Sequence, residues 1–389
     1  MNFWGITGTN GKTTTTWIFA EFLNATPGRK CGYVTTVEVN TGSRQFYTGY
    51  TTPPLAQLKE IFAEMEANGC TDCVMEVSSH AIHQHRTGDT VFSGGIFTNL
   101  SEDHLDYHKT MEAYFDVKLD FARQIAAAHP TTPDMGRKDL PPYVVCLDGG
   151  YGREMFNAVG NLAVNVIGVS ASSSSYDLSH LQLAGDYNRS NVQCAAALAE
   201  AAGVSRETVQ AVIPTLKPRW GRLEEVKSKS EKVKSRVFVD FAHTPDGLEK
   251  VLAAVRGEMT SNLQPPTLKP SLWVVFGAGG DRDPMKRPLM GEACAKLADR
   301  LVVTSDNPRS EDPMKIIEAI VAGIKPSSVA RPASLAVEPD RAKAIRYALA
   351  NAAAGDIVII AGKGHETTQE IAGVKHPFDD REQVRAFGG

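Results

Sequence analysis

The sequence lacks the long apolar segments that mark membrane proteins. No apolar run approaches the roughly 18 residues needed to cross a bilayer. The first residues also lack the charged, apolar and small-residue pattern of a signal peptide. The formal net charge of the 389-residue chain is only −4, so its charge gives no reason to expect a polyanionic partner. We expect a cytoplasmic protein that binds neither membrane nor nucleic acid.

Cysteine is also scarce. Six cysteines are scattered along the chain, unlike the dense framework of a small secreted domain, so we expect free thiols. Cys70 and Cys73 have the spacing of a redox motif, but they lie between a helix-like stretch and the apolar segment VMEV. A pair of buried thiols at a strand edge is the simpler interpretation, and a redox pair is the alternative.

Short apolar runs alternate with helical patterns along the chain. FWGIT precedes TTTWIFAEFL near the N-terminus, and CVMEV, GGIFTNL, YVVCL, VFVDF, LWVVFG and IVIIAG follow at intervals. Such alternation is typical of parallel sheets covered by helices on both faces, with ligands at the carboxyl ends of the strands. We therefore predict an α/β fold with a central, mostly parallel sheet domain and a smaller Rossmann-like α/β domain after it.

The chain is too long for one ordinary core, and we expect two domains. A break at LKPRWGR is followed by the charged segment VKSKSEKVKSR, and VFVDF then begins a second α/β unit. We place the first domain at residues 1–217 and the second at 218–389. Residues 126–183, with a Pro-rich piece and the run SASSSS, are expected to be partly loop.

A glycine-rich loop, TGTNGKTTTT, follows the first predicted strand. Gly8 and Gly11 let backbone amides face phosphate oxygens, Lys12 neutralises phosphate charge, and the Thr13 hydroxyl can bind magnesium. The general phosphate-loop pattern has glycine where Ile6 stands, so the match is partial. A purely structural turn would not need a lysine followed by four threonines. No G-x-G-x-x-G follows the first strand, which disfavours a Rossmann oxidoreductase.

The loop resembles the ATP-binding loop of the Mur ligase family, and the resemblance extends over nearly the whole chain. Members of that family phosphorylate a carboxylate with ATP and then let an amine displace the phosphate. The resemblance implies an ATP-dependent ligase that forms an amide bond and needs magnesium. It implies that ATP is bound by Gly8, Thr9, Asn10, Gly11, Lys12, Thr13 and Thr14.

Magnesium is required because the charge of the transferring phosphoryl group must be neutralised. Glu76 ends an apolar run in MEVSSH, where a carboxylate is well placed to hold the ion. By resemblance, Glu76 and Thr13 bind one Mg²⁺ and His104 binds a second. Lys118 matches the lysine that carries a carbamate in this family, and a carbamate is an anion that can bind metal. The implied catalytic set is Lys12, Glu76, His104 and Lys118.

Further segments match residues that contact the nucleotide in the family. Asn188 and Asn191 in GDYNRSN would lie near adenine, and Arg222 in WGRLE would lie near the phosphates. Asp240 and His243 in VDFAHTPDG match residues of the C-terminal domain that close onto the ribose and phosphate region. Such closure would exclude water from a hydrolysable acyl phosphate.

The motifs GAGGDRDPMKRP, SDNPRSEDP and AGKGHE narrow the resemblance. They are similar to the branch that adds meso-diaminopimelate to a muramoyl dipeptide in peptidoglycan synthesis. There the arginine of DNPR grips the distal carboxylate of the amino acid, which a bidentate guanidinium suits. The resemblance implies an amino-acid pocket formed by Arg282, Asn307, Arg309, Gly362 and Glu366. It implies contacts to the muramoyl dipeptide from Thr51, Thr52, Ser78 and Arg86.

Several alternatives stay open at this point. Family members carry a further domain before the phosphate loop that binds the uridine diphosphate of the acceptor, whereas Met1 here lies just before the first predicted strand. We expect either a trimmed form or a naturally short ligase, whose acceptor lacks the nucleotide or whose partner supplies that domain. A ligase for another carboxylate acceptor and a catalytically idle homologue are the other two possibilities. We expect a monomer that acts on small molecules.

Overall fold

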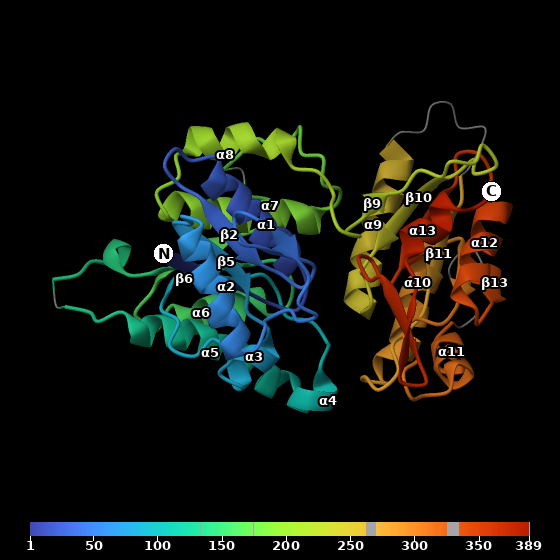
Figure 1. Ribbon diagram of the computed structural model, residues 1–389, viewed down its shortest axis with the longest axis horizontal. Coiled ribbons are helices and arrows are strands. Elements are labelled where there is room, and N and C mark those ends of the chain that lie inside the picture. The colour runs from blue at the N-terminus through green and yellow to red at the C-terminus, as the bar shows by residue number, and fades with distance from the viewer. Residues whose placement is uncertain (133, 174, 262–269, 325–333, 389) are drawn as a thin grey trace. The chain divides into compact units, whose positions relative to one another are not determined.

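The computed structural model describes residues 1–132, 134–173, 175–261, 270–324 and 334–388 (Figure 1). Within them the chain divides into two units, Met1–Ser101 with Tyr107–Lys217 and Glu102–Asp106 with Pro218–Gly389. Each unit is built on a mostly parallel sheet with helices, which confirms the predicted α/β class. No helix in the described ranges is long and apolar enough to span a bilayer.

The first unit is built on an eight-stranded sheet. Its strands are β1 (Asn2–Thr7), β2 (Cys31–Val34), β3 (Val39–Asn40), β4 (Gln45–Phe46), β5 (Asp72–Glu76), β6 (Phe92–Phe97), β7 (Pro142–Cys146) and β8 (Asn165–Val169). The spatial order is β4-β3-β2-β5-β1-β6-β7-β8, with β3 and β4 antiparallel at one edge and the other strands parallel. The central strands therefore end at one common edge.

Helices cover both faces of this sheet (Figure 1). They are α1 (Lys12–Asn24), α2 (Leu55–Ala67), α3 (Ser79–His83), α4 (Leu105–His108), α5 (Met111–Ala128), α6 (Gly152–Val159), α7 (Asp186–Ala201) and α8 (Arg206–Val212), with short 3-10 turns at Arg137–Asp139 and Ile213–Thr215. Successive strand residues point to opposite faces, so Trp4 packs on Phe19 of α1 (ring centroids 5.5 Å apart) while Phe3 packs on Phe62 of α2 (4.7 Å).

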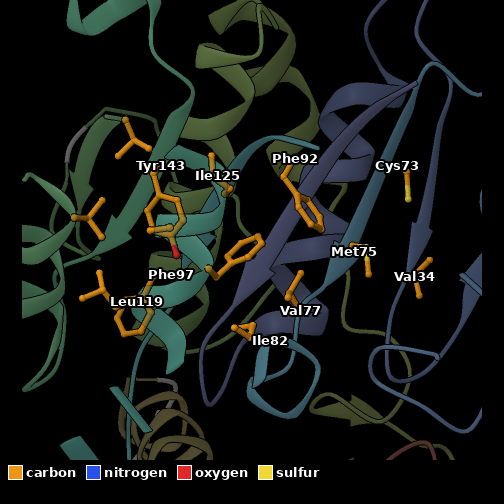
Figure 2. Close-up of a cluster of buried hydrophobic side chains, with 14 of the residues drawn as sticks. Val34, Cys73, Met75, Val77, Ile82, Phe92, Phe97, Leu119, Ile125 and Tyr143 are labelled. Carbon is orange, nitrogen blue, oxygen red and sulfur yellow. The ribbon is translucent and has the colours of Figure 1, made fainter. Parts of the chain in front are cut away.

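The core on the α2 and α5 side of the sheet is continuous. Figure 2 shows side chains from the strands, such as Met75 and Phe97, in one cluster with Leu119 and Ile125 of α5. Helix α5 begins where the Thr110 hydroxyl accepts a hydrogen bond from the Ala113 amide (3.2 Å), a normal N-cap. This cap and this packing fix the helix that carries Lys118.

The second unit has a six-stranded sheet and a separate hairpin. Its strands are β9 (Glu224–Glu225), β10 (Arg236–Asp240), β11 (Leu272–Phe276), β12 (Arg300–Val303), β13 (Ser334–Val337), β14 (Ile357–Ala361), β15 (Thr368–Ile371) and β16 (Val374–Pro377). The sheet order is β13-β12-β11-β14-β10-β9, and only β9 runs antiparallel. Strands β15 and β16 form the hairpin.

Helices also flank the second sheet. They are α9 (Pro245–Ser261), α10 (Lys286–Leu297), α11 (Pro313–Val321), α12 (Arg341–Asn351) and α13 (Asp380–Arg385). Helices α12 and α13 cover the face where Trp273, Val358 and Ile360 form a core with Ile345 and Val384. The carboxyl ends of β10, β11, β12 and β14 again meet at one edge, where ligands are expected in such sheets.

The structure supports the simpler interpretation of the cysteines. All six are buried free thiols, and Cys73 lies within β5 with Cys70 just before it. Burial raises the pKa of the Cys73 thiol well above its ordinary value. A reactive thiol needs a lowered pKa, so the raised pKa favours the interpretation of Cys73 as a buried structural thiol.

Replacing Gly5 with alanine should test the packing of β1 on α5. A Cβ at this position would lie 2.2 Å from Cζ of Phe121, so we expect Gly5→Ala to lower the free energy of unfolding by about 1–3 kcal/mol. Gly150→Ala is the matched control, because no atom lies within 4 Å of the added Cβ there. Urea unfolding of both variants checks this, and equal effects would contradict the packing argument.

Candidate functional site

The glycine-rich loop lies between β1 and α1, at the carboxyl edge of the first sheet. Gly8 (φ 148°) and Gly11 (φ 83°) both have positive φ, which disfavours residues with a Cβ. A Cβ on Gly8 would also lie 1.9 Å from the Thr98 hydroxyl, and one on Gly11 would lie 2.5 Å from the Asn191 amide oxygen. The loop leads into the N-terminus of α1, where backbone amides suit a phosphate.

Two lysines converge on this loop. The Lys12 ammonium donates to the carbonyls of Gly8 and Thr9 (both 2.9 Å), and the Lys118 ammonium donates to the same Gly8 carbonyl (2.9 Å). Lys118 is only 1% exposed and lies 4.7 Å from the ring centroid of Tyr114. The structure thus concentrates positive charge at the loop, as a polyphosphate requires.

Glu76 lies at the end of β5 beside the start of α1, with 1% of its surface exposed. Its Oε1 accepts hydrogen bonds from the Thr13 hydroxyl (2.7 Å) and the Thr36 amide (2.8 Å), and its Oε2 accepts one from the Thr36 hydroxyl (3.0 Å). A buried carboxylate beside a hydroxyl offers the hard oxygen ligands that Mg²⁺ prefers. The residues present therefore fit the ion.

No cluster of three His, Cys, Asp or Glu side chains among the described residues is placed to hold a metal. This finding is compatible with magnesium at Glu76, since Mg²⁺ is usually bound by one or two carboxylates and completes its shell with water and substrate phosphate.

The residues expected on the acceptor side also lie together. The Thr52 hydroxyl donates to the Glu76 carbonyl (2.8 Å) and accepts from the Ser78 amide (3.0 Å), while the Arg86 guanidinium donates to the Thr52 carbonyl (3.2 Å). The Thr36 hydroxyl lies 3.0 Å from that of Thr51. The Ser78 hydroxyl caps α3. These side chains surround the end of β5.

The expected adenine contacts lie on α7 against the phosphate loop. The Asn191 amide donates to the Asn188 side-chain oxygen (3.2 Å), and Asn188 in turn donates to the Ala184 carbonyl (2.8 Å). On the other side of the loop, the Asn10 amide donates to the Asn99 side-chain oxygen (2.9 Å). The loop is therefore fastened by Asn99, and Asn191 lies close to Gly11. Thr14, half-buried, lies in the first turn of α1.

In the second unit, three basic side chains gather around Phe241. The Arg222 guanidinium lies 4.5 Å from the ring centroid, and the rings of His243 and His365 lie 4.6 Å and 5.0 Å away. Burial lowers the pKa of His243, and burial with the charge of Arg222 lowers that of His365 to about 3. Both shifts favour the neutral form of the imidazole.

Asp240 anchors the backbone around this cluster. Its two carboxylate oxygens accept hydrogen bonds from the amides of Leu223 (2.6 Å) and Ala242 (2.7 Å). Burial raises its pKa, although Arg222 acts against that shift. The carboxylate is thus engaged in holding the backbone, and its expected contact with the ribose region stays a prediction.

The motifs expected to form the amino-acid pocket meet at the carboxyl edge of the second sheet. The Asn307 amide donates to Glu366 (2.8 Å), and the fully buried Lys363 ammonium donates to both Glu366 (2.8 Å) and the Asn307 oxygen (3.0 Å). Gly362 has a φ of 116°, and a Cβ there would lie 2.4 Å from Oδ2 of Asp306. That oxygen is buried and accepts no hydrogen bond from the described residues, so it suits an amine donor.

Arg309 has a positive φ of 51°. Its amide donates to the Glu370 carbonyl of β15 (3.0 Å), and its guanidinium donates to the Gly280 carbonyl (2.5 Å). Arg282 is exposed, and its Cγ would lie 3.7 Å from a Cβ at Gly279. The two arginines therefore flank the same glycine-rich turn after β11.

His104 also has a positive φ (56°) and lies in the short Glu102–Asp106 segment of the second unit. Its Nε2 lies 3.5 Å from Asp103, whose other oxygen lies 3.6 Å from the Lys286 ammonium. Although burial opposes it, the charges of His104 and Lys286 hold the pKa of Asp103 well below its usual range. The arrangement of His104 with Glu76 stays a prediction.

Several site residues escaped the sequence analysis. Thr36 holds Glu76, Tyr114 lies under Lys118, and Asn99 fastens the phosphate loop. Asn99 directly follows an apolar strand, so the rule that ligands lie after strands would have found it. Lys363 lies within the quoted motif AGKGHE, but its complete burial has no signal in the sequence.

The glycine-rich loop lies before a helix, and the threonine that follows the loop lysine donates to a buried carboxylate. This arrangement is typical of proteins that bind a nucleoside triphosphate with magnesium. Family comparisons sharpen this class. The Mur ligase middle domain matches residues 6–199, and the Mur ligase, glutamate ligase domain matches residues 221–364. The chain belongs to the Mur ligase family, whose members are ATP-dependent ligases that form amide bonds.

Comparisons with individual proteins agree with this family assignment. The chain is 40% identical to the UDP-N-acetylmuramoyl-L-alanyl-D-glutamate--2,6-diaminopimelate ligase of Synechococcus elongatus, over 98% of this chain and 75% of that protein. It is 38% identical to the ligase of the same name from Aquifex aeolicus, over 100% of this chain and 78% of that protein. A solved structure of such a ligase aligns with a TM-score of 0.58 and 31% identity, over 99% of this chain and 77% of that one.

A solved Mycobacterium tuberculosis folylpolyglutamate synthase, complexed with ADP and AMPPCP, aligns with a TM-score of 0.61 over 93% of this chain and 88% of that one. Its sequence identity is only 18%. This likeness shows a shared fold and nothing further.

The neutral His365 should make stability depend on pH. Its pKa is about 3 in the native protein and about 6.5 in an unfolded chain. Between these values only the unfolded state takes up the proton. The free energy of unfolding should therefore fall as the pH drops below about 6.5, by at most about 1.4 kcal/mol per pH unit.

Chemical denaturation between pH 7 and pH 5 measures this dependence. We expect His365→Asn to make the decline in stability less steep. The matched control is His376→Asn, at an exposed position on β16, which should keep the slope of the parent protein. An unchanged slope in His365→Asn would show that the imidazole is not held neutral.

Proposed function

We propose that the chain adds meso-diaminopimelate to the γ-carboxylate of D-glutamate in a MurNAc-L-Ala-D-Glu acceptor, with or without its uridine diphosphate, at the expense of ATP. One observation carries the proposal. The chain is 40% identical, over 98% of its length, to a protein named UDP-N-acetylmuramoyl-L-alanyl-D-glutamate--2,6-diaminopimelate ligase. The reaction places it in peptidoglycan synthesis.

The reaction proceeds in two steps. An oxygen of the D-glutamyl γ-carboxylate attacks the γ-phosphorus of ATP, the bond to the bridging oxygen breaks, and ADP leaves. The neutral amine of diaminopimelate then attacks the carbonyl carbon of the acyl phosphate, loses a proton, and expels phosphate. The backbone amides of the loop and the Lys12 ammonium hold the phosphates, while Thr52, Ser78 and Arg86 position the acceptor beside Glu76.

Magnesium neutralises charge on the β- and γ-phosphates when it is bound. We assign Thr13 and Glu76 to one ion and His104 to a second, with Lys118 as a further ligand after carbamylation. Burial of an ammonium group costs free energy, and Lys118 is 1% exposed. A carbamate replaces that buried cation with an anion that binds a cation, which supports the assignment.

The two units take different substrates in this proposal. The first domain, residues 1–217, binds ATP and the acceptor, and Asn188 and Asn191 contact the adenine. The second domain, residues 218–389, contributes Arg222, Asp240 and His243 toward the phosphate and ribose region. Its pocket at Asn307, Arg309 and Glu366 takes the amino acid, with Asp306 and Glu366 facing its ammonium group and Arg309 its distal carboxylate.

We further propose that the protein works as a monomer in the cytoplasm on small molecules and does not bind nucleic acid. Six buried free thiols fit a reducing compartment, and ATP is available there. A single chain carries the residues for all three substrates, so a second copy is not needed.

The decisive assay measures phosphate release and peptide product in the presence of ATP, Mg²⁺, acceptor dipeptide and amino acid. We expect turnover only when all four are present, with meso-diaminopimelate preferred over L-lysine on nucleotide-linked or nucleotide-free acceptor. Arg309→Lys keeps the charge but loses the bidentate fork, so kcat/KM for meso-diaminopimelate should fall about 10- to 100-fold.

The same variant should leave the slower reaction with L-lysine nearly unchanged, because lysine has no distal carboxylate to grip. Phosphate release from ATP alone at the full rate would contradict a ligase. An unchanged preference for meso-diaminopimelate in Arg309→Lys would contradict the assigned role of Arg309.

The carbamate is testable by direct observation. The parent protein, incubated with ¹³C-bicarbonate and Mg²⁺, should show a carbamate carbon resonance that is absent from Lys118→Arg. Activity of Lys118→Arg should fall by about 10²–10³, because arginine cannot form the carbamate and the proposed ligand to the second Mg²⁺ would be lost.

Lys12→Arg provides the matched control, because Lys12 donates to the same Gly8 carbonyl as Lys118. This variant should lose activity through weaker phosphate binding and still show the carbamate resonance. A resonance that persists in Lys118→Arg would place the carbamate on another lysine.

A further inference from the structure

A fully buried ion pair lies behind the amino-acid pocket. Arg341, the first residue of α12, and Asp380, the first residue of α13, both have 0% side-chain exposure. The guanidinium grips the carboxylate with two parallel hydrogen bonds, Nε to Oδ1 (2.8 Å) and NH2 to Oδ2 (2.7 Å). Burial alone would lower the pKa of Arg341, but Asp380 raises it, so the group stays charged.

The guanidinium also connects two strands that are not neighbours. It donates to the Ala361 carbonyl at the end of β14 (2.9 Å) and to the Ser305 carbonyl just after β12 (3.4 Å). Strand β11 lies between β12 and β14 in the sheet. Hydrogen bonds within the sheet therefore cannot join these two ends directly, and Arg341 does so across the end of β11.

The two carbonyls directly precede the two motifs of the pocket. Ser305 is followed by Asp306, Asn307 and Arg309, and Ala361 is followed by Gly362, Lys363 and Glu366. The motifs touch, since a Cβ on Gly362 would lie 2.4 Å from the Asp306 carboxylate and 4.0 Å from the Arg341 guanidinium. The spacing that Arg341 sets between the strand ends is thus the spacing between the two walls of the pocket.

A purely structural role is a weak explanation for this pair. Replacing a buried ion pair by apolar residues of similar volume is often neutral or stabilising. Two carboxylate oxygens and two backbone carbonyls, in contrast, require several donors in a planar fork, which among side chains only arginine offers. The contacts of Arg341 therefore fit a role in fixing the separation of the two strand ends.

We propose that Arg341, oriented by Asp380, is a positioning residue for the amino-acid substrate. It holds the DNPR and GKGHE segments at the separation that meso-diaminopimelate needs, and it touches no substrate itself. This inference rests on the proposed function, because it assigns the same pocket to the incoming amino acid. A small displacement of substrate-positioning groups has large kinetic effects.

The test is steady-state kinetics of Arg341→Lys and Asp380→Asn with ATP, Mg²⁺, the nucleotide-linked acceptor dipeptide and either meso-diaminopimelate or L-lysine. We expect KM for meso-diaminopimelate to rise about tenfold or more in both variants. KM for ATP and for the acceptor should stay within about twofold. The ratio of kcat/KM for meso-diaminopimelate to that for L-lysine should fall about tenfold.

The matched control is the Arg29–Asp72 pair of the first unit. Arg29 also grips a buried aspartate, donating from Nε to Asp72 Oδ2 (2.9 Å), and it also donates to a distant backbone carbonyl, that of Ala202 (2.7 Å). Arg29→Lys should lower thermal stability and leave the KM for meso-diaminopimelate and the selectivity ratio unchanged.

The outcomes separate the two proposals. KM values and the selectivity ratio do not depend on how much of a variant folds, so partial misfolding does not obscure the result. Equal changes in all three KM values, an unchanged selectivity ratio, or complete loss of folded protein in both variants would overturn the positioning role. Failure of the parent protein itself to use meso-diaminopimelate would instead overturn the proposed function.

Discussion

The hydrogen bond from the Thr13 hydroxyl to Glu76 (2.7 Å) joins the start of α1 to the end of β5, and the magnesium site proposed for the first unit depends on it. A carboxylate with 1% exposure is stable only if its charge is met by donors, and Thr13 and Thr36 supply them. These bonds hold two hard oxygens side by side next to the phosphate loop. In the proposed function, Thr13 and Glu76 would hold Mg²⁺ through these two oxygens with little reorganisation.

Buried cationic side chains occur in both units, and they lie where parallel strands end. Lys118 donates to the loop after β1, Lys363 lies just after β14, and Arg341 joins the ends of β12 and β14. Strand ends expose carbonyl groups that have left the sheet ladder and need donors. A buried cation meets that need. Donors of the same kind therefore hold the strand ends in both units.

The sequence predicts the central strands well, because strands buried on both faces appear as continuous apolar runs. LWVVF and IVIIA are of this kind, at β11 and β14. The two-residue strands β3 and β4 were missed, since polar segments such as Gln45–Phe46 become strands only through their partners. In the second sheet, β13 was missed as well, because it is an edge strand with exposed side chains.

The site residues also divide into those that a local sequence pattern indicates and those that only the fold brings together. Glu76 is recognisable as an acid after an apolar strand, whereas Lys118 is an ordinary helical lysine without the family resemblance. Thr36 reaches Glu76 across 40 positions of sequence, and only the pairing of β2 with β5 brings the two together. Arg341 opens the segment RAKAIRYALA, where an arginine normally faces solvent. Its burial depends on Asp380, 39 positions away. No local sequence pattern predicts this pairing.

The conformation of Arg309 depends on segments that are remote in the sequence. A non-glycine residue in the left-handed region costs about 1–2 kcal/mol, and Arg309 has a φ of 51°. Two hydrogen bonds hold this conformation. The Arg309 amide donates to the Glu370 carbonyl of β15, and its guanidinium donates to the Gly280 carbonyl in the turn after β11. The Gln369 amide also donates to the Asp306 carbonyl (2.7 Å). The hairpin therefore determines where the guanidinium projects, and in the proposed function the choice of amino acid would depend on it.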